Sequence, residues 1–393
     1  MDFSNYIADH VREIPRSGIR DFFEVVQTMT DVISLGIGEP DYVTPWRIRE
    51  AAIFGMEKGR TGYTSNLGLP KLRSAIAHYI ERRYGVTYHP NDEILVSVGV
   101  SEALDIALRA LLNPGDEVIF HEPSYVSYNP SVLLSYGKAV SVKTAAKHDF
   151  RLLAEDIAKV ITPRSKALLL SFPTNPTGGV LRAEDLRPIA ELCMRHDLIV
   201  LSDEIYSELV YDGMEHISIA SLPGMRDRTV LLNGCSKSFA MTGFRVGYAC
   251  APSPIIEAMM KIHQYAIMCA STMSQEAAIE ALENCQREAE TMRNDYERRR
   301  NFVVNRLNEI GLPCHSPKGA FYVFPNITPT GLKSKDFSLQ LLKSKKVAVV
   351  PGSAFGVSGE GFVRCCFATG LEKLKEAVTR IEQFVSELPT RHG

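Results

Sequence analysis

Lys237 is the residue of this sequence with the clearest potential for covalent chemistry. It lies among small residues, in Asn-Gly-Cys-Ser-Lys-Ser at 233–238, and it follows the apolar run 230–232, which predicts a buried strand. An amine at the end of such a strand is partly removed from water, and Arg245 adds a second positive charge eight residues later. Both effects lower the pKa of a lysine, so Lys237 is predicted to be a nucleophile that forms Schiff bases with carbonyl compounds.

Two more polar residues follow predicted strands. Asn175 lies in Pro-Thr-Asn-Pro-Thr-Gly-Gly after the apolar run 167–172, and Asp203 follows the run 198–202. Taken alone, each has an ordinary explanation: Asn-Pro and Gly-Gly are common in turns, an aspartate after a strand is often a helix N-cap, and a single lysine is usually on the surface. Their spacing of about one strand-helix-strand unit each indicates that Asn175, Asp203 and Lys237 meet in one crevice.

The elements that would position these residues alternate between strands and helices. Short apolar runs at 94–98, 117–121, 167–172, 198–202, 230–232 and 246–251 predict strands, and helical patterns such as 101–112 and 183–196 separate most of them. This alternation predicts an α/β fold with a mostly parallel central sheet covered by helices on both faces. Ligands of such sheets bind at the carboxyl ends of the strands.

The C-terminal part of the chain has a different pattern. Residues 286–310 are charged and amphipathic, which predicts a long connecting helix, and its Arg-Arg-Arg run at 298–300 is expected on a solvated face. Residues 311–393 are expected to combine short strands with two helices.

The segments around Asn175, Asp203, Lys237 and Arg364 together resemble the class I and II aminotransferases that depend on pyridoxal phosphate. These enzymes have fold type I, and the resemblance is to their aspartate and aromatic aminotransferase-like members. The matching motifs are Asn-Pro-x-Gly, Asp-Glu-x-Tyr, the lysine segment and Gly-Phe-Val-Arg-Cys-Cys-Phe-Ala at 361–368. The resemblance extends from about residue 30 to residue 380. It implies a large coenzyme-binding domain at 48–285 and a smaller α+β domain made of 1–47 and 286–393, with 286–310 as the connecting helix.

The resemblance implies a role for each residue near the coenzyme ring. Lys237 would hold pyridoxal phosphate as a Schiff base and move the substrate α-proton, and Asp203 would keep the ring nitrogen protonated. Asn175 and Tyr206 would hydrogen-bond the phenolic oxygen, and Tyr125 would stack on the ring. The catalytic residues are therefore expected to be Lys237, Asp203 and Tyr206.

The coenzyme phosphate is expected at a strand-to-helix junction. The residues assigned to it by the resemblance and by the preference of helix N-termini for anions are Gly99, Val100, Ser101, Ser236, Arg245 and, from a partner chain, Tyr63. Ser101 is equally compatible with a plain helix N-cap. The family more often has serine three residues before the lysine, where this chain has Gly234, so the expected phosphate site lacks one hydroxyl group.

The substrate carboxylate is assigned to Arg364, whose guanidinium can bind it through two hydrogen bonds. The family resemblance also assigns Asn175 and Gly38 to the substrate, Gly38 because glycine lets the backbone approach closely. The segment Ser-Gly-Ile-Arg at 17–20 is expected to close over the substrate, with Ile19 in contact and Arg20 equally compatible with a surface charge.

The implied reaction is a ping-pong transfer of the amino group of an L-amino acid (aspartate, aromatic or related) to a 2-oxo acid such as 2-oxoglutarate. The segment 263–271 contains no arginine that could bind a second carboxylate, which argues against strict specificity for aspartate. Two alternatives stay open: a β-lyase or aminocyclopropane-carboxylate synthase-like enzyme with the same ring-binding residues, and a non-enzymatic regulator. The regulator is disfavoured because only about 30 residues precede the matched region and no basic helix is present.

Composition limits the environment of the protein. The 393 residues carry a formal net charge of −2, which gives no basic field for nucleic acid or anionic membranes. The eight cysteines lack metal or disulfide spacing, the ten histidines lack metal spacing, and no apolar stretch is long enough to span a bilayer. We therefore expect a cytoplasmic enzyme without a metal, with small-molecule substrates, that forms a homodimer with shared active sites. The homodimer is implied only by the match at Tyr63.

Overall fold

The computed structural model describes residues 3–14 and 29–388, and its central element is a seven-stranded sheet in the order β2-β8-β7-β6-β5-β3-β4. The strands are Ile94–Ser97 (β2), Glu117–Glu122 (β3), Lys138–Lys143 (β4), Ser165–Ser171 (β5), Ile199–Asp203 (β6), Thr229–Gly234 (β7) and Gly247–Cys250 (β8). Strand β8 is antiparallel to β2 and β7, and the other neighbouring strands are parallel. The predicted mostly parallel α/β sheet is thus confirmed.

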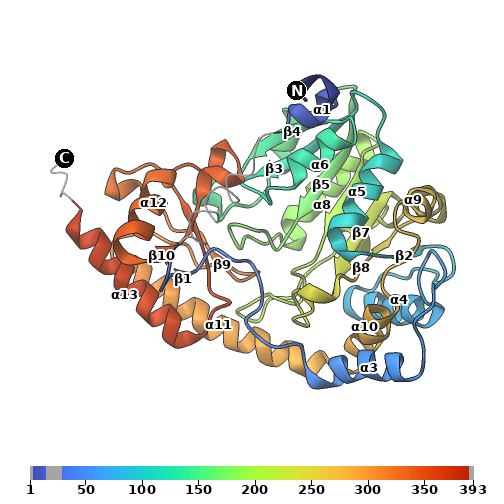
Figure 1. The fold of residues 1–393 in the computed structure, drawn as a ribbon. Helices are drawn as coiled ribbons and strands as arrows, with labels where there is room; N and C mark the ends of the chain where they lie inside the picture. The colour runs from blue at the N-terminus through green and yellow to red at the C-terminus, as the bar shows by residue number, and fades with distance from the viewer. Residues whose placement is uncertain (1–2, 15–28, 389–393) are drawn as a thin grey trace.

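Helices cover both faces of this sheet because its strands are apolar on both sides (Figure 1). In β5, Ala167 and Leu169 belong to a core shared with α5 (Gly99–Leu111) and α9 (Ser253–Ala266). Leu168 and Leu170 belong to the opposite core, shared with α7 (Ala154–Ala158) and α8 (Ala183–Arg195). Successive side chains of a strand point to opposite faces, so a run without polar residues is buried between two layers of helices.

The remaining helices of the N-terminal two thirds cover one end of the sheet and its edge. A third core surrounds β2 and includes residues from α3 (Trp46–Glu57), α4 (Pro70–Tyr84) and α10 (Thr272–Asn284). Helix α6 (Tyr128–Leu134) packs on α5 and β4, and the short α1 (Asp9–Arg12) contacts α6.

The C-terminal residues build a separate group of elements around small sheets. Strands β9 (Tyr322–Val323), β11 (Val350–Pro351) and β12 (Val363–Cys366) form one antiparallel sheet, covered by α12 (Ser334–Lys345) and α13 (Leu371–Glu387). Strand β1 (Ile33–Ser34) pairs with β10 (Val347–Ala348), so the N-terminal segment joins this group. Helix α11 (Gln286–Glu309) runs from α10 to α13 along the base of the molecule (Figure 1).

The strand ends differ from the predicted runs by one or two residues, and one strand was not predicted. Strand β4 was not predicted, because this edge strand leaves Lys138 and Lys143 exposed and does not form an apolar run. Strand β6 extends one residue further than predicted, so that Asp203 is the last residue of the strand, paired with Leu232 of β7. The carboxylate is therefore fixed by the sheet.

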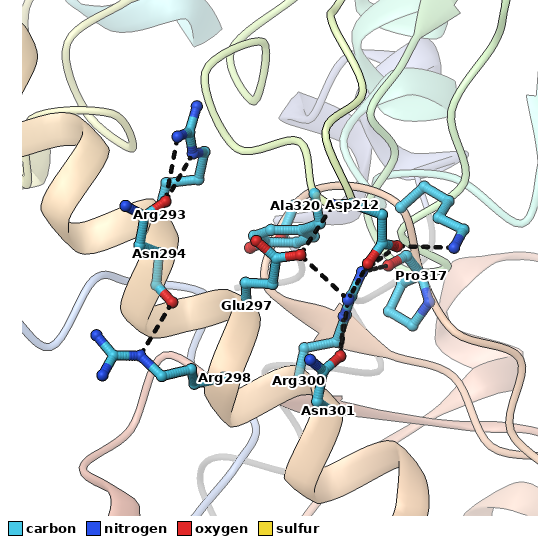
Figure 2. Close-up of polar contacts among 11 residues, drawn as sticks. Asp212, Arg293, Asn294, Glu297, Arg298, Arg300, Asn301, Pro317 and Ala320 are labelled. Atoms are coloured by element: carbon cyan, nitrogen blue, oxygen red, sulfur yellow. Dashed lines mark hydrogen bonds and ion pairs between the residues drawn. The ribbon is translucent and has the colours of Figure 1, made fainter.

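The prediction that the arginine run 298–300 faces solvent is wrong for Arg299 and Arg300. Arg300 is only 1% exposed and reaches from α11 to Asp212, with Nη2 2.7 Å from Oδ1, while its Nη1 donates to the Pro317 carbonyl at 3.0 Å (Figure 2). Arg298 alone points outward. Buried guanidinium groups require paired acceptors, and these come from segments remote in sequence.

The second buried arginine of α11, Arg299, holds the N-terminal segment. Its Nη1 lies 2.8 Å from Asp41 Oδ2 and its Nη2 lies 2.7 Å from Asp295 Oδ2. The segment that enters the cavity described below is therefore anchored to α11 by an ion pair in which the guanidinium is buried.

Within residues 3–14 and 29–388, no helix is long and apolar enough to cross a membrane. The same residues contain no group of three or more histidine, cysteine or acidic side chains arranged to hold a metal ion.

Candidate active site

A cavity of about 620 Å³ opens where the carboxyl ends of β5 and β6 meet the loop after β7. Most of the predicted site residues line it: Gly38, Val100, Ser101, Tyr125, Asn175, Asp203, Tyr206, Ser236, Lys237, Arg245 and Arg364. The parallel strands bring these residues together because their carboxyl ends lie at one edge of the sheet. The opposite wall of the cavity comes from the C-terminal group of elements and the N-terminal segment that joins it. It consists of residues 36–38, Tyr322 and Arg364.

Asp203 is the buried acid of the cavity. Its Oδ2 accepts a hydrogen bond from the Tyr128 hydroxyl at 2.8 Å, and its Oδ1 accepts one from the Ile205 N–H at 3.2 Å. Burial raises the pKa of Asp203 to about 6, although both hydrogen bonds act in the opposite direction. This carboxylate is therefore suited to a cationic partner within the cavity.

Lys237 lies on the turn that follows β7, and its Nζ donates to the Gly38 carbonyl at 2.8 Å. Burial lowers the pKa of Lys237 to about 8, and the positive charges of Arg245 and Arg364 act in the same direction. This is the direction that the sequence predicted. About a tenth of an amine with this pKa is unprotonated and nucleophilic at pH 7, far more than at the ordinary pKa of lysine.

Arg364 lies on β12 and is held on both sides. Its Nη1 donates to Asn175 Oδ1 at 2.8 Å and its Nη2 to the Gly36 carbonyl. The rings of Tyr322 and Phe355 lie 4.5 and 4.9 Å from its guanidinium carbon. Each Nη group retains a second N–H, so the guanidinium can still bind a carboxylate in a fixed orientation.

Tyr206 and Gly38 both contact Tyr322, a residue that the sequence analysis did not identify. The hydroxyls of Tyr206 and Tyr322 lie 2.8 Å apart. A Cβ atom on Gly38 would lie 2.2 Å from the Tyr322 hydroxyl oxygen, so any other residue at this position would have to displace the Tyr322 side chain. The close approach that favours glycine here is thus to a tyrosine of the same chain.

Two of the predicted phosphate-binding residues, Gly99 and Arg245, meet at the start of α5. Gly99 has a φ of +76°, and a Cβ atom there would lie 2.7 Å from Arg245 Nη2. A side chain at 99 would therefore fill the space between the helix N-terminus and the guanidinium, which is the space that an anion would use.

Gly234 occupies the position where the family more often has serine, and the structure gives a physical reason. A Cβ atom at Gly234 would lie 3.0 Å from Gly247 Cα and from the Val246 carbonyl oxygen. Because β7 and β8 approach so closely there, a serine would require these neighbouring strands to shift. Ser236 is the hydroxyl of this loop that lines the cavity.

Among the described residues, two predicted site residues, Gly99 and Tyr63, do not line the cavity. Tyr63 is 84% exposed and lies outside the lining of the cavity. Ile19, like Arg20, lies outside the described residues.

Sequence reasoning missed Tyr128, Tyr322 and Phe355. Each is a buried aromatic residue, and a buried aromatic residue is more often part of the core than of a site. The one available signal was for Tyr128, which lies three residues after the predicted Tyr125; the two rings meet edge-on with their centroids 5.6 Å apart.

This donor set fits pyridoxal phosphate at each of its reactive positions: an amine for the aldehyde, a buried acid for the ring nitrogen, and a helix N-terminus with an arginine for the phosphate. The fold and the site thus define a pyridoxal-phosphate enzyme of fold type I. Residues 30–381 match the model of the family "Aminotransferase class I and II", and the chain belongs to this family.

Relatives with named activities agree with this assignment. The chain is 49% identical over 383 residues to the aspartate aminotransferase of Pyrococcus abyssi, covering 97% of this chain and 98% of that one. It is 45% identical over 383 residues to the aromatic-amino-acid aminotransferase 2 of Thermococcus litoralis, with the same coverage of 97% and 98%.

A solved structure, the aromatic aminotransferase of Pyrococcus horikoshii, aligns with a TM-score of 0.90 at 49% identity and covers 94% of this chain and 99% of that one. Amino-group transfer with pyridoxal phosphate is therefore the activity of this protein, and the lyase and regulator alternatives are set aside.

Proposed function

We propose that this cavity is the active site and that Lys237, Asp203 and Arg364 carry the reaction. The observation that supports this most strongly is the convergence, on one cavity, of an acid whose pKa is raised and an amine whose pKa is lowered. Pairs of groups whose pKa values are moved in opposite directions are typical of acid–base sites. When bound, pyridoxal phosphate supplies an electron sink that makes the α-proton of an amino acid removable.

The residues of the chain would provide binding, orientation and proton movement. Asp203 holds a proton on the coenzyme ring nitrogen, with the Tyr128 hydroxyl keeping the carboxylate in position. Lys237 would bind the coenzyme and, once released from it, would take the α-proton of the substrate and deliver it to C4′, the coenzyme carbon that carried the aldehyde. Arg364 binds the substrate carboxylate and fixes the α-proton on the side that faces Lys237.

Asn175 and the two tyrosines would orient these groups. Asn175 supports Arg364 through its Oδ1 and has an amide N–H₂ left for the phenolic oxygen of the coenzyme. Tyr206 directs its hydroxyl to the same oxygen, while Tyr322 supports it from behind. Tyr125, which is 37% exposed, forms the stacking wall of the ring site.

The substrate is proposed to be an L-amino acid of the aspartate or aromatic class, with 2-oxoglutarate as amino acceptor in a ping-pong cycle. The relatives named above divide between these two classes. The basic residues among the described lining are Lys237, Arg245 and Arg364, and all three already have a role. The remainder of the lining includes Ile37 and Leu104, which suit an uncharged or aromatic side chain.

A panel of amino donors with 2-oxoglutarate as acceptor tests this function directly. We expect glutamate formation with aromatic donors to exceed that with aspartate in kcat/KM. The Lys237→Ala variant should lose turnover and still bind pyridoxal phosphate weakly. Normal turnover by this variant would refute the proposed proton transfer by Lys237.

We further propose a homodimer whose two chains share their active sites through Tyr63. The loop that carries Tyr63 is held in place, since Arg60 binds Glu276 at 3.0 Å and the Gly62 carbonyl accepts from Thr272 at 2.8 Å. An exposed aromatic side chain on a fixed loop suits a contact with a second chain. A monomeric mass in solution, with Tyr63→Phe unchanged in coenzyme affinity, would refute this.

We also propose a cytoplasmic location and a division of the chain into two domains. The eight cysteines are free thiols, seven of them buried, which agrees with a cytoplasmic enzyme. Residues 48–285 would act as the coenzyme-binding domain, and 1–47 together with 286–393 as the smaller domain that brings Arg364 to the substrate.

A further inference from the structure

A contact between a fully buried imidazole and a partly buried carboxylate lies behind the turn that leads into α5. The carboxylate is that of Glu102, in the first turn of this helix, and its Oε1 lies 2.7 Å from Nδ1 of His263. His263 comes from α9, which packs along α5, and its side chain is 0% exposed. Neither residue lines the active-site cavity.

The second oxygen of the same carboxylate fixes the backbone just before the helix. Glu102 Oε2 accepts the N–H of Val98, the residue that precedes Gly99. The hydroxyl of Ser97 donates to the Gly99 carbonyl at 2.9 Å, which keeps that carbonyl turned inward. The first N–H groups of α5 have no carbonyl partner within the helix, so they remain available on the cavity side.

His263 supplies the proton of this contact, because an ionised carboxylate can only accept. Its other nitrogen, Nε2, is buried with no hydrogen-bond partner within the described residues. The proton on Nδ1 fixes the imidazole against Glu102. The imidazole therefore orients the carboxylate of Glu102.

We propose that Glu102 and His263 are positioning residues for the coenzyme phosphate: together they lock residues 98–101 in the conformation that presents backbone N–H groups to the phosphate. This rests on the proposed phosphate position at Gly99, Ser101 and Arg245. A carboxylate is a surprising neighbour for a dianion, because its charge alone would weaken binding. Its presence is explained if the conformational lock outweighs the repulsion.

The backbone contacts and the charge of Glu102 act on phosphate affinity in opposite directions: the contacts raise it and the charge lowers it. The measurement is the affinity of the full-length apoenzyme for pyridoxal phosphate and for pyridoxal, which lacks the phosphate, by spectroscopic titration. The dissociation constant of pyridoxal divided by that of pyridoxal phosphate gives the contribution of the phosphate. General damage to the ring site affects both constants and cancels in this ratio. We expect Glu102→Ala to reduce this ratio about tenfold, the scale of one hydrogen bond to a charged group.

Further variants separate the effect of the Glu102 hydrogen bonds from the effect of its charge. Glu102→Gln retains a carbonyl for the Val98 N–H, so its ratio should fall less than that of Glu102→Ala. His263→Leu removes the second half of the contact at similar volume and should reduce the ratio about threefold. Asp105→Ala is the matched control and should leave the ratio unchanged: it removes a carboxylate of the same helix whose one ion pair within the described residues is with Arg109, at 3.0 Å.

The proposal is overturned if both Glu102 variants keep or increase the wild-type ratio, because charge repulsion would then dominate. An equal loss of affinity for pyridoxal and for pyridoxal phosphate in Glu102→Ala and His263→Leu would overturn it as well. Arg245→Met tests the underlying phosphate position separately. If Arg245→Met leaves the ratio unchanged, the proposed phosphate site is wrong, whatever the Glu102 variants show.

Discussion

Replacing Asp203 by asparagine should make the coenzyme-free protein more stable and the enzyme nearly inactive. Burial raises the pKa of Asp203 from 3.8 to about 6, so the folded chain bears a free-energy penalty when this carboxylate is ionised. Asparagine occupies the same volume without a charge, and its carbonyl oxygen can still accept the hydrogen bond of the Tyr128 hydroxyl. The penalty is removed and this contact is kept.

The size of the effect follows from the shift of the pKa. A difference of about two pH units between folded and unfolded states corresponds to roughly 3 kcal/mol. The asparagine N–H₂ group would face the N–H of Ile205, which removes one hydrogen bond and costs about 1 kcal/mol. The net gain is then about 2 kcal/mol, or roughly 2–3 °C in melting temperature for a chain of this length.

The gain depends on pH in a defined direction. Below about pH 4 the carboxyl of Asp203 is protonated in both the folded and the unfolded state, so asparagine offers no advantage. The folded-state penalty of the wild type develops as the pH rises from about 4 to about 6, and it is constant above that. The stability difference between variant and wild type should follow this curve in the apoenzyme.

The coenzyme reverses the order of stabilities. Bound pyridoxal phosphate gives the wild-type carboxylate a cationic partner, whereas asparagine gains nothing from it. Thermal denaturation of both proteins, with and without coenzyme at pH 8, should therefore show the variant more stable when empty and less stable when loaded. Turnover of the variant should fall about a hundredfold or more, since the proton on the ring nitrogen is no longer held.

Glu204→Gln provides the contrasting control. Glu204 is the next residue, is also buried, and accepts hydrogen bonds from Ser202 at 2.8 Å, from Ser218 at 2.7 Å and from His216 at 2.9 Å. An amide cannot accept all three, so this substitution should destabilise the protein with and without coenzyme. An Asp203→Asn apoenzyme that is less stable than wild type at pH 8, or whose gain persists at pH 4, would refute the reasoning.

Three further substitutions test the contacts around the cavity. Gly38→Ala places a Cβ atom 2.2 Å from the Tyr322 hydroxyl oxygen and should destabilise the protein by about 1–3 kcal/mol, while adding Tyr322→Phe should restore much of the loss in thermal denaturation. Tyr128→Phe removes a hydrogen bond that lowers the pKa of Asp203, so the pH midpoint of coenzyme binding, measured by titration, should move to a higher pH. Arg364→Lys should raise the KM for both amino acid and 2-oxo acid at least about tenfold in steady-state assays, because lysine lacks the planar pair of donors.

The sequence was sufficient for features that local patterns encode. Asn175, Asp203 and Lys237 each follow an apolar run of strand length, and the topology of a parallel sheet brings such strand ends together. The strands themselves were predictable because both of their faces are apolar, which leaves little ambiguity about burial. The edge strand β4 was missed because it lacks two apolar faces: its exposed lysines interrupt the apolar pattern.

Contacts between remote segments were not predictable from local patterns. Nothing near Gly38 in the sequence indicates that Tyr322 will approach it, and nothing in an Arg-Arg-Arg run distinguishes the exposed Arg298 from the buried Arg300. The burial of Arg300 depends on Asp212, which lies 88 residues away. Charge patterns predict the surface on average, and they fail where a second segment supplies the opposite charge.

The same physical cause acts on the two central groups of this site, with opposite results. Desolvation disfavours the charged form of any group, so it raises the pKa of Asp203 to about 6 and lowers that of Lys237 to about 8. Without coenzyme, the fold thus bears a penalty at both residues when they are charged. A ligand that brings a cation to Asp203 and converts the amine of Lys237 into a covalent bond removes both penalties at once. Tight binding of such a ligand therefore follows from the burial of the site, and Asp203→Asn, which removes one of the two penalties in advance, should weaken that binding even though it stabilises the empty protein.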